Sequence, residues 1–223
     1  SARNSEVIHA GLYYAPGSLR ATLCVAGRRA LYQYCAERRV GHVKCGKLVV
    51  ACSEDEIPIL EGIAARSDAN GVENTRMVDA REAARIEPEV ACVRALVSDE
   101  SGVVDSHGFM VALLRDARSH GAELVPMSPV LGGDLHSRGA TVDIGGSQPS
   151  RLKAPLVINA AGLGAWKVAR AMGIDAPERY LAKGTWFDLA GKPPFRGLIY
   201  PLPTGYSLGI HSCLDLTGRV RFG

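Results

Sequence analysis

The chain lacks three features that would each point to a broad class of protein: strong net charge, a long hydrophobic run and paired cysteines. Its formal net charge is only +3 over 223 residues, and no basic run is interleaved with aromatic residues. This balance argues against a nucleic-acid partner. No apolar stretch approaches the ~20 residues that a membrane-spanning helix needs, which leaves peripheral association with a membrane open.

The six cysteines include no Cys-x-x-Cys pair, and their spacing matches no zinc site. Several lie in apolar stretches, where a cysteine behaves as a small buried side chain. We therefore expect free thiols in a reducing, cytoplasmic compartment, with neither structural disulfides nor a metal. The sequence also has no signal peptide and no initiator methionine, and it predicts an interior portion of a longer protein.

The composition is that of a globular protein, with 47% hydrophobic and 22% charged residues. Apolar spacing and capping residues predict five helices. They run from Ser18 to about Arg39, from Ser53 to Asn70, from Asp79 to before Pro88, from Ser106 to about His120, and from Trp166 to Met172. In the first of them the predicted apolar face consists of Leu19, Leu23, Leu31, Tyr34 and Cys35.

Strands are predicted between these helices from short apolar or β-branched runs. They are Cys45–Cys52, Arg94–Ser98, Val103–Val104, Leu124–Met127, a run near Val130, Thr141–Ile144 and Leu156–Asn159, followed by a β pattern from Lys183 onward. The order within residues 106–172 is similar to part of a nucleotide-binding α/β layer. The flanking segments predict an interleaved α+β domain with an antiparallel sheet, so the expected fold class is α/β plus α+β.

The opening segment, SARNSEVIHAGLYY, is unusually polar for the entry to a strand. Ser1, Arg3, Asn4 and Ser5 supply hydrogen-bonding groups, and His9 follows a small apolar step. The small residues at positions 10 and 11 would let the backbone approach a ligand closely. The segment therefore suits a large planar polar ligand, and a polar loop leading into a strand is the alternative.

A second candidate site is the turn VINAAG at residues 157–162. Small residues between a strand and a helix N-terminus expose backbone N–H groups that can bind an anion. Tight packing of strand onto helix explains the same residues, and the third glycine of the dinucleotide fingerprint is absent. Both interpretations stay open from the residues alone.

The third candidate group lies in the C-terminal β pattern. Arginine and lysine bind carboxylates, so Lys183, Arg219 and Arg221 are candidate substrate-binding cations, with Tyr200 beside them in the pattern. A neutral histidine can accept a hydroxyl proton near pH 7, which makes His211 the first candidate base and His9 the second. The alternatives are a structural histidine and solvated charges at strand ends.

Seven motifs occur in one order along the chain: NSEVIHAG, CGKLVVA, VDSHGFM, VINAAGL, KGTWF, LIYPLP and LGIH. In combination they resemble the 2-hydroxyglutarate oxidase/dehydrogenase branch of the D-amino-acid-oxidase-like, FAD-dependent oxidoreductases. The resemblance implies a Rossmann-like FAD/NAD(P)-binding layer of the glutathione-reductase type, interleaved with an antiparallel-sheet substrate domain. It implies a flavin-facing loop at 1–16, substrate-domain parts at 17–98 and 176–223, and an FAD-binding segment at 99–175.

The same resemblance implies FAD as the cofactor. It places Ser1, Arg3, Asn4, Ser5 and His9 on the flavin-facing wall. It places Ala160, Ala161 and Gly162 against the ADP half of FAD, and the backbone of Val130 against adenine. The family's GxGxxG turn and C-terminal glycine-rich segment are absent from this sequence. This chain alone is therefore expected to bind FAD weakly or not at all.

The activity implied by the resemblance is oxidation of a 2-hydroxy acid, first of all (S)-2-hydroxyglutarate to 2-oxoglutarate, by hydride transfer to flavin N5. Oxygen or a membrane quinone would then accept the electrons, and the protein would be cytoplasmic or peripheral on the inner membrane. The alternatives are an FAD-dependent amine, amino-acid or glycerol-3-phosphate oxidoreductase, or a non-catalytic truncated fragment.

Overall fold

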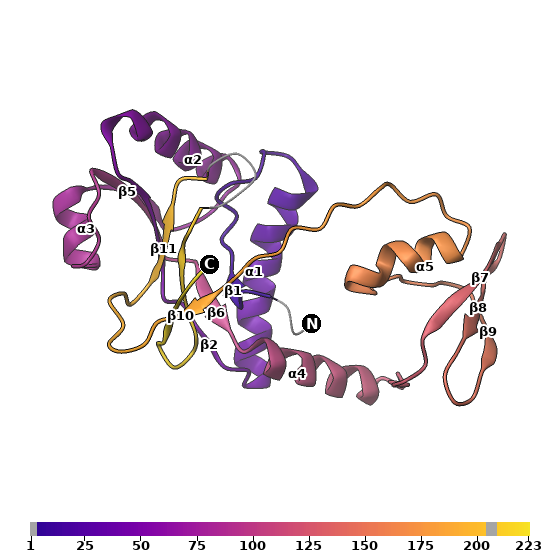
Figure 1. Cartoon of the computed structure of the whole chain (residues 1–223). Coiled ribbons are helices and arrows are strands. Elements are labelled where there is room, and N and C mark those ends of the chain that lie inside the picture. Colours follow the sequence, from indigo (N-terminus) through magenta and orange to yellow (C-terminus); the bar gives the residue numbers. More distant parts are fainter. Residues whose placement is uncertain (1–3, 204–208) are drawn as a thin grey trace. The chain divides into compact units, whose positions relative to one another are not determined.

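The computed structural model describes residues 4–203 and 209–223. The chain divides into two compact units (Figure 1), the first formed by Ser1–Leu113 with Gly184–Gly223 and the second by Leu114–Lys183. The predicted domain boundaries stay a prediction, because this division by compactness does not test which segment binds a cofactor.

The first unit holds most of the helices and strands. In chain order they are β1 (Val7–Ile8), α1 (Leu19–Arg38), β2 (His42–Val43), β3 (Lys47–Ala51), the 3-10 turn η1 (Glu54–Glu56), α2 (Ile57–Ala69), β4 (Thr75–Asp79), α3 (Ala80–Ile86), β5 (Arg94–Ser98), β6 (Gly102–Val104), the start of α4 (Ser106–Ser119), β10 (Phe187–Asp188), β11 (Leu198–Pro201), β12 (Ser212–Leu214) and β13 (Val220–Phe222). The second unit holds β7 (Val130–His136), β8 (Gly139–Ile144), β9 (Ser150–Ala154), the 3-10 turn η2 (Gly162–Gly164) and α5 (Ala165–Ala171).

A seven-stranded sheet forms the centre of the first unit, in the order β10-β13-β12-β11-β3-β5-β4. All five residues of β3 are buried, which confirms the buried strand predicted at Cys45–Cys52. The sheet is antiparallel except where β11 runs parallel to β3, with Leu198 opposite Lys47. A parallel neighbour needs a long connection, and here that connection includes the whole second unit.

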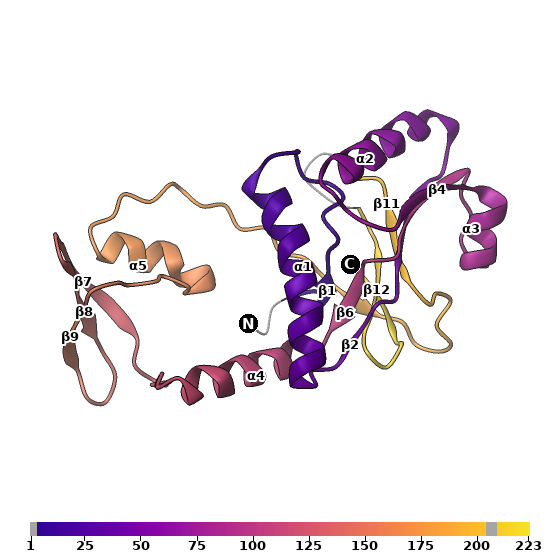
Figure 2. The ribbon, with the colours of Figure 1, turned by 180° about the vertical axis from the view of Figure 1, so that it is seen from behind.

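Both faces of this sheet are covered. On one face Val25 of α1 and Leu60 of α2 share a cluster with Val49 of β3. On the other face Ala83 of α3 packs with Leu48 of β3. The separate sheet β1-β6-β2 packs against α1, as the reverse view of Figure 2 lets the reader follow.

The first long helix begins as predicted but turns a partly different face inward. The Oγ atom of Ser18 accepts a hydrogen bond from the N–H of Ala21, which caps α1. Leu19 and Leu23, predicted as core residues, are 78% and 64% exposed. The buried positions are Ala21, Val25 and Arg28, together with Cys35, which the predicted face includes. The difference is therefore confined to the first half of the helix, since Leu31 and Tyr34 are partly buried as well. The smaller side chains allow a close approach, because a Cβ on Gly11 would lie 3.0 Å from Val25 Cγ2.

Two helix caps differ in detail from the sequence prediction. Asp105, not Ser106, caps α4, because its Oδ1 accepts from the N–H of Gly108 at 2.9 Å. The Ser106 hydroxyl donates to Glu6 Oε1 at 3.0 Å. Before α2, Ser53 makes no side-chain cap bond, and Glu56 accepts from the N–H of Cys52 at 2.5 Å. By contrast, Asp79 caps α3 as predicted, with its Oδ1 2.8 Å from the N–H of Glu82.

The second unit contains an antiparallel meander, β7-β8-β9, against which α5 packs. The strands predicted at Leu124–Met127 and Leu156–Asn159 are wrong: neither segment pairs with a strand in the described part of this unit. A strand needs a neighbour to accept its backbone hydrogen bonds, whatever its propensity. Met127 also adopts a φ of 58°, which ends an extended segment.

Candidate functional site

The His211 imidazole lies just before β12 in the first unit, and its orientation is fixed by the backbone. Its Nδ1 atom lies 2.9 Å from the carbonyl oxygen of Gly209. A carbonyl only accepts, so Nδ1 carries the proton, and in the neutral ring Nε2 keeps its lone pair. Gly209 has a φ of 72°, and a Cβ there would lie 2.7 Å from Pro201 Cγ, so glycine permits this turn.

Aromatic rings flank His211. The Tyr200 ring lies at a centroid distance of 4.3 Å and an interplanar angle of 40°, and Trp186 lies edge-on at 5.2 Å. A Cβ on Gly223 would lie 2.4 Å from Trp186 Cδ2, so only glycine leaves room for the indole ring. Burial lowers the pKa of His211, and the charge of Lys47 acts in the same direction. The ring is therefore a neutral proton acceptor at pH 7.

The second candidate base, His9, belongs to the same electrostatic neighbourhood. Burial, then Lys47, then His211 lower the pKa of His9 to about 4. The two histidines, predicted independently as bases and 202 positions apart, thus come close enough to influence each other. No hydrogen bond from residues 4–203 or 209–223 orients the His9 ring, which distinguishes it from His211.

Lys47 is the residue of this site that the sequence reasoning missed. It is 1% exposed, and its Nζ lies 3.8 Å from the centroid of the Tyr200 ring and 5.8 Å from that of Tyr13. Burial lowers the pKa of Lys47 to about 8, while nearby thiols oppose that effect. A signal was present in the sequence, because Lys47 is the one charged residue between Cys45 and Cys52.

The predicted substrate-binding cations have different surroundings. Arg219 is an exposed residue whose Nε lies 2.9 Å from Asp215 Oδ2, a pairing within a surface turn that does not support the predicted role. Arg221 is half-buried on β13 opposite Cys213, with its Nη2 3.9 Å from Glu6 Oε2. Lys183 belongs to the second unit.

Tyr200 lies in the interior of the same site. Its side chain is 1% exposed, and its hydroxyl lies 3.6 Å from Cys213 Sγ. Burial raises the pKa of this phenol well above its usual range. The ring contacts His211 and Lys47, and the predicted contact of Tyr200 with substrate stays a prediction.

The opening segment resembles its alternative interpretation, a polar loop leading into a strand. Ser1 and Arg3 lie outside the described residues. Asn4 Oδ1 accepts from the N–H of Glu6 at 2.8 Å, and Ser5 Oγ accepts from the N–H of Val7 at 3.5 Å. These local bonds use polar groups that were predicted to face a cofactor. The small residue Gly11 packs against Val25 of α1, as described above.

In the second unit the structure brings together three of the predicted cofactor residues. Val130, Ala160 and Ala161 line one cavity of about 340 Å³, together with Val157, Ile158, Asn159 and Val168. None of these side chains carries a charge, so the cavity fits a flat ring such as adenine better than a phosphate.

The anion site predicted at the VINAAG turn has less support. The N–H of Ala161 points to its neighbour Asn159 Oδ1 at 3.4 Å. The helix that follows, α5, has only seven residues, so its N-terminal dipole is short. Gly162 has a φ of 56° at the start of the 3-10 turn and lines a different cavity.

The comparison with known proteins decides the family. The sequence profile of the family described as FAD dependent oxidoreductase matches residues 1–223. The chain belongs to this family. It is 38% identical to L-2-hydroxyglutarate dehydrogenase, mitochondrial, of Arabidopsis thaliana, with 100% of this chain and 53% of that protein covered. It is 31% identical to L-2-hydroxyglutarate dehydrogenase of Escherichia coli (strain K12), with 99% and 53% covered. The chain thus spans about half the length of these relatives.

Solved structures of FAD-dependent oxidases share the fold. L-alpha-glycerophosphate oxidase from Mycoplasma pneumoniae, reduced by dithionite and with FAD bound, aligns with a TM-score of 0.82 at 22% identity over 99% of this chain and 59% of that one. Glycine oxidase from Geobacillus kaustophilus aligns with a TM-score of 0.74 at 19% identity over 98% and 59%. The predicted fold class, an FAD-binding α/β fold, is confirmed.

Two further findings concern residues 4–203 and 209–223. Within them, no helix is both long and apolar enough to traverse a bilayer. The same part of the chain contains no group of three or more histidine, cysteine, aspartate or glutamate side chains placed to hold a metal ion.

Proposed function

We propose that this chain supplies the proton acceptor and part of the FAD site of an enzyme that oxidises (S)-2-hydroxyglutarate to 2-oxoglutarate. The observation that carries the proposal is the His211 ring, held by Gly209 so that Nε2 can accept a proton. The substrate comes from the names of relatives that match the chain over its whole length. The glycerol-3-phosphate and amine alternatives have support from fold similarity alone.

In this proposal His211 Nε2 takes the proton of the C2 hydroxyl group. Bound FAD would supply an acceptor for the hydride from C2, so that substrate loses one hydride and one proton to become the 2-oxo acid. The aromatic walls around His211 exclude water from the reacting atoms. Arg221 is the proposed partner of a substrate carboxylate, since a carboxylate needs a cation when it leaves water. Lys183 keeps the substrate-binding role that the family resemblance implies.

Each unit contains residues that the family resemblance assigns to FAD. Within the second unit, we assign the cavity lined by Val130, Ala160 and Ala161 to the adenine end of FAD. Gly162, which lines another cavity of that unit, keeps the role that the resemblance implies. Within the first unit, Asn4, Ser5 and His9 are assigned to the flavin end. Ser1 and Arg3, which lie outside the described residues, keep the role that the family resemblance implies. This assignment is supported by the uncharged lining of the cavity and by the position of His9 near His211.

The test is anaerobic reduction of the flavin. Protein incubated with FAD and freed of excess should be yellow, with absorbance near ~450 nm, and (S)-2-hydroxyglutarate should bleach it. The (R) enantiomer, sarcosine and glycerol 3-phosphate are the comparison substrates. Bleaching by one of these and not by (S)-2-hydroxyglutarate would reassign the substrate, and protein that stays colourless with added FAD would show that this chain alone forms no FAD site.

The proposed base is tested by His211→Gln. We expect the variant to retain bound FAD but to lose at least about 100-fold in bleaching rate, because general base catalysis contributes about 10²–10⁴-fold. His120→Gln is the matched control, since this exposed histidine bonds only within the end of α4. A His211→Gln variant with full activity would move the role to His9, and His9→Gln would then be tested in the same way.

The final electron acceptor is proposed from the family resemblance as oxygen or a membrane quinone. Reoxidation of the bleached protein by air and by a soluble quinone analogue, compared under the same conditions, distinguishes the two. Sedimentation with vesicles tests the proposed peripheral association with a membrane.

A further inference from the structure

The buried side chain of Lys47 has no role in the reaction as described so far. Its ammonium group lies over the faces of two tyrosine rings, and the thiols of Cys213, Cys45 and Cys24 are the ionisable groups that act on it. Burial of a cation is costly, so a fold retains it where its charge serves a purpose.

The geometry connects Lys47 to the proposed base through a single ring. Its Nζ lies 3.8 Å from the Tyr200 centroid, and the His211 centroid lies 4.3 Å from that same ring. The ammonium group is therefore within about 8 Å of the imidazole, and both groups contact the same Tyr200 ring. At such a distance inside a protein, a unit charge has a substantial effect on the protonation of its neighbour.

We propose that Lys47 is a positioning residue of the hydroxy-acid site: its buried ammonium group, stacked on Tyr200, keeps the imidazole of His211 neutral and therefore ready to accept a proton. The proposal rests on the proposed function for its consequence in catalysis, but its electrostatic part concerns this chain alone. Lys47 acts through its charge and does not touch the reacting atoms.

The other ionisable groups around Lys47 do not compete for this role. Tyr13 and Tyr200 have raised pKa values because they are buried, so both stay neutral. Burial also raises the pKa of each neighbouring thiol, those of Cys24, Cys45 and Cys213. Arg221, on β13, is the nearby second cation, and it acts on the Cys213 thiol. Among the described residues, Lys47 is the charged group that lowers the pKa of both His9 and His211.

The experiment is an NMR titration of the six histidine rings in the protein without cofactor, assigned with His9→Gln and His211→Gln. In Lys47→Met the titration midpoints of His211 and His9 should rise by about 0.5 pH unit or more, toward the ordinary value of 6.5. Lys47→Arg retains a cation and should keep both midpoints low. Lys44→Met removes an exposed lysine paired with Glu100 and is the matched control.

Lys47→Gln is a second neutral variant, with a side chain that ends in a polar group. It provides the same test if Lys47→Met does not fold. Unchanged midpoints in either folded neutral variant would overturn the proposal, as would an equal rise in Lys47→Arg. In FAD-loaded protein, the acid limb of the bleaching rate should shift with the midpoints, so that the rate near pH 5.5 falls about threefold. Raised midpoints without any bleaching by hydroxy acid would support the electrostatic role and reject the proposed function.

Discussion

At the scale of single residues, Glu87 shows how one buried carboxylate joins two distant segments. It is 2% exposed at the end of α3. Its Oε1 accepts from the backbone N–H of Gly197 at 2.6 Å and from that of Arg196 at 2.9 Å. The carboxylate thereby fixes the chain just before β11 begins.

Replacing Glu87 with glutamine should destabilise the first unit by about 2 kcal/mol. The amide has one acceptor oxygen, and its NH₂ group would face donors, so a charge-assisted bond is lost. Urea unfolding followed by Trp186 fluorescence, with Trp166 replaced by phenylalanine, measures the change. Glu89→Gln alters an exposed carboxylate two residues away and should cost less than about 0.5 kcal/mol. Equal effects of the two substitutions would contradict this account.

The lowered pKa values of His9 and His211 predict that the folded chain loses stability in mild acid. The pKa of His9 is about 4 in the folded chain and 6.5 in the unfolded one, so the unfolded state binds more protons between these values. Stability should fall as the pH drops from 6.5 to 4.5, by about 2 kcal/mol from His9, and His211 contributes in the same direction. The same urea assay at the two pH values measures the loss, and His9→Gln should reduce it. A loss unchanged in His9→Gln would assign it to other groups.

The site was predictable from sequence where chemistry and position coincide. In the motif LGIH, His211 lies two residues after Gly209, and the carbonyl oxygen of Gly209 orients the imidazole. The role of Lys47 was not predictable, because it depends on Tyr200 and Tyr13, which come from strands and loops far apart in the sequence. Arg219 was predicted from its residue type alone, and its partner Asp215 becomes evident only when the turn is formed.

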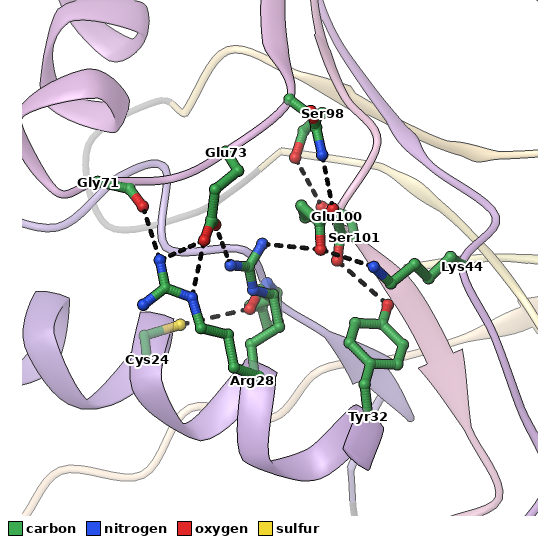
Figure 3. A network of polar contacts seen from close by, with 12 residues as sticks. Cys24, Arg28, Tyr32, Lys44, Gly71, Glu73, Ser98, Glu100 and Ser101 are labelled. Carbon is green, nitrogen blue, oxygen red and sulfur yellow. Dashed lines mark hydrogen bonds and ion pairs between the residues drawn. The ribbon is translucent and has the colours of Figure 1, made fainter. Parts of the chain in front are cut away.

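At the scale of secondary-structure elements, an ion network joins α1 to the ends of β4 and β5. The Arg28 side chain is buried and pairs with Glu73, and its Nη1 lies 3.2 Å from Glu100 Oε2 (Figure 3). The same Glu100 carboxylate accepts from Lys44 Nζ at 2.8 Å and from Asn74 Nδ2 at 2.9 Å. The network explains why this part of α1 is buried despite its charge.

Arg28→Met should destabilise the first unit by about 2–3 kcal/mol, because removal of a buried partner leaves the carboxylates less well compensated. The cost is below that of a fully buried pair, since the Glu73 side chain is 43% exposed. Arg29→Met is the matched control: Arg29 pairs with the other oxygen of Glu73 from a side chain that is 57% exposed, and its loss should cost less than about 1 kcal/mol. Urea unfolding measures both, and a larger cost for Arg29 would contradict the argument.

Elements were predicted correctly where local signals suffice. Caps at Ser18 and Asp79, and the apolar run of β3, depend on neighbours within a few residues. The strands predicted at Leu124–Met127 and Leu156–Asn159 failed because pairing is decided by tertiary contacts. The parallel β3–β11 pair was likewise missed, since its register joins segments about 150 residues apart.

At the scale of the whole molecule, the two units should differ in stability. The buried core of the second unit consists of Ala140, Val142 and Met172, whereas the first unit has four clusters of buried residues. Hydrogen exchange should therefore be slowest at β3 and β5 and markedly faster at β7, β8 and β9. Mass spectrometry of peptides across residues 47–51 and 139–144 measures this difference. Equal protection of the two segments would contradict it.

The parallel pairing of β3 with β11 has a consequence for biosynthesis. Residues 47–50 leave the ribosome long before residues 198–201, with which they pair. At translation rates of about 5–20 residues per second, one edge of β3 stays unpaired in the nascent chain for roughly ten seconds or more. An unpaired apolar edge can recruit a strand from another chain, so we expect newly made protein to be most prone to aggregation before β11 emerges.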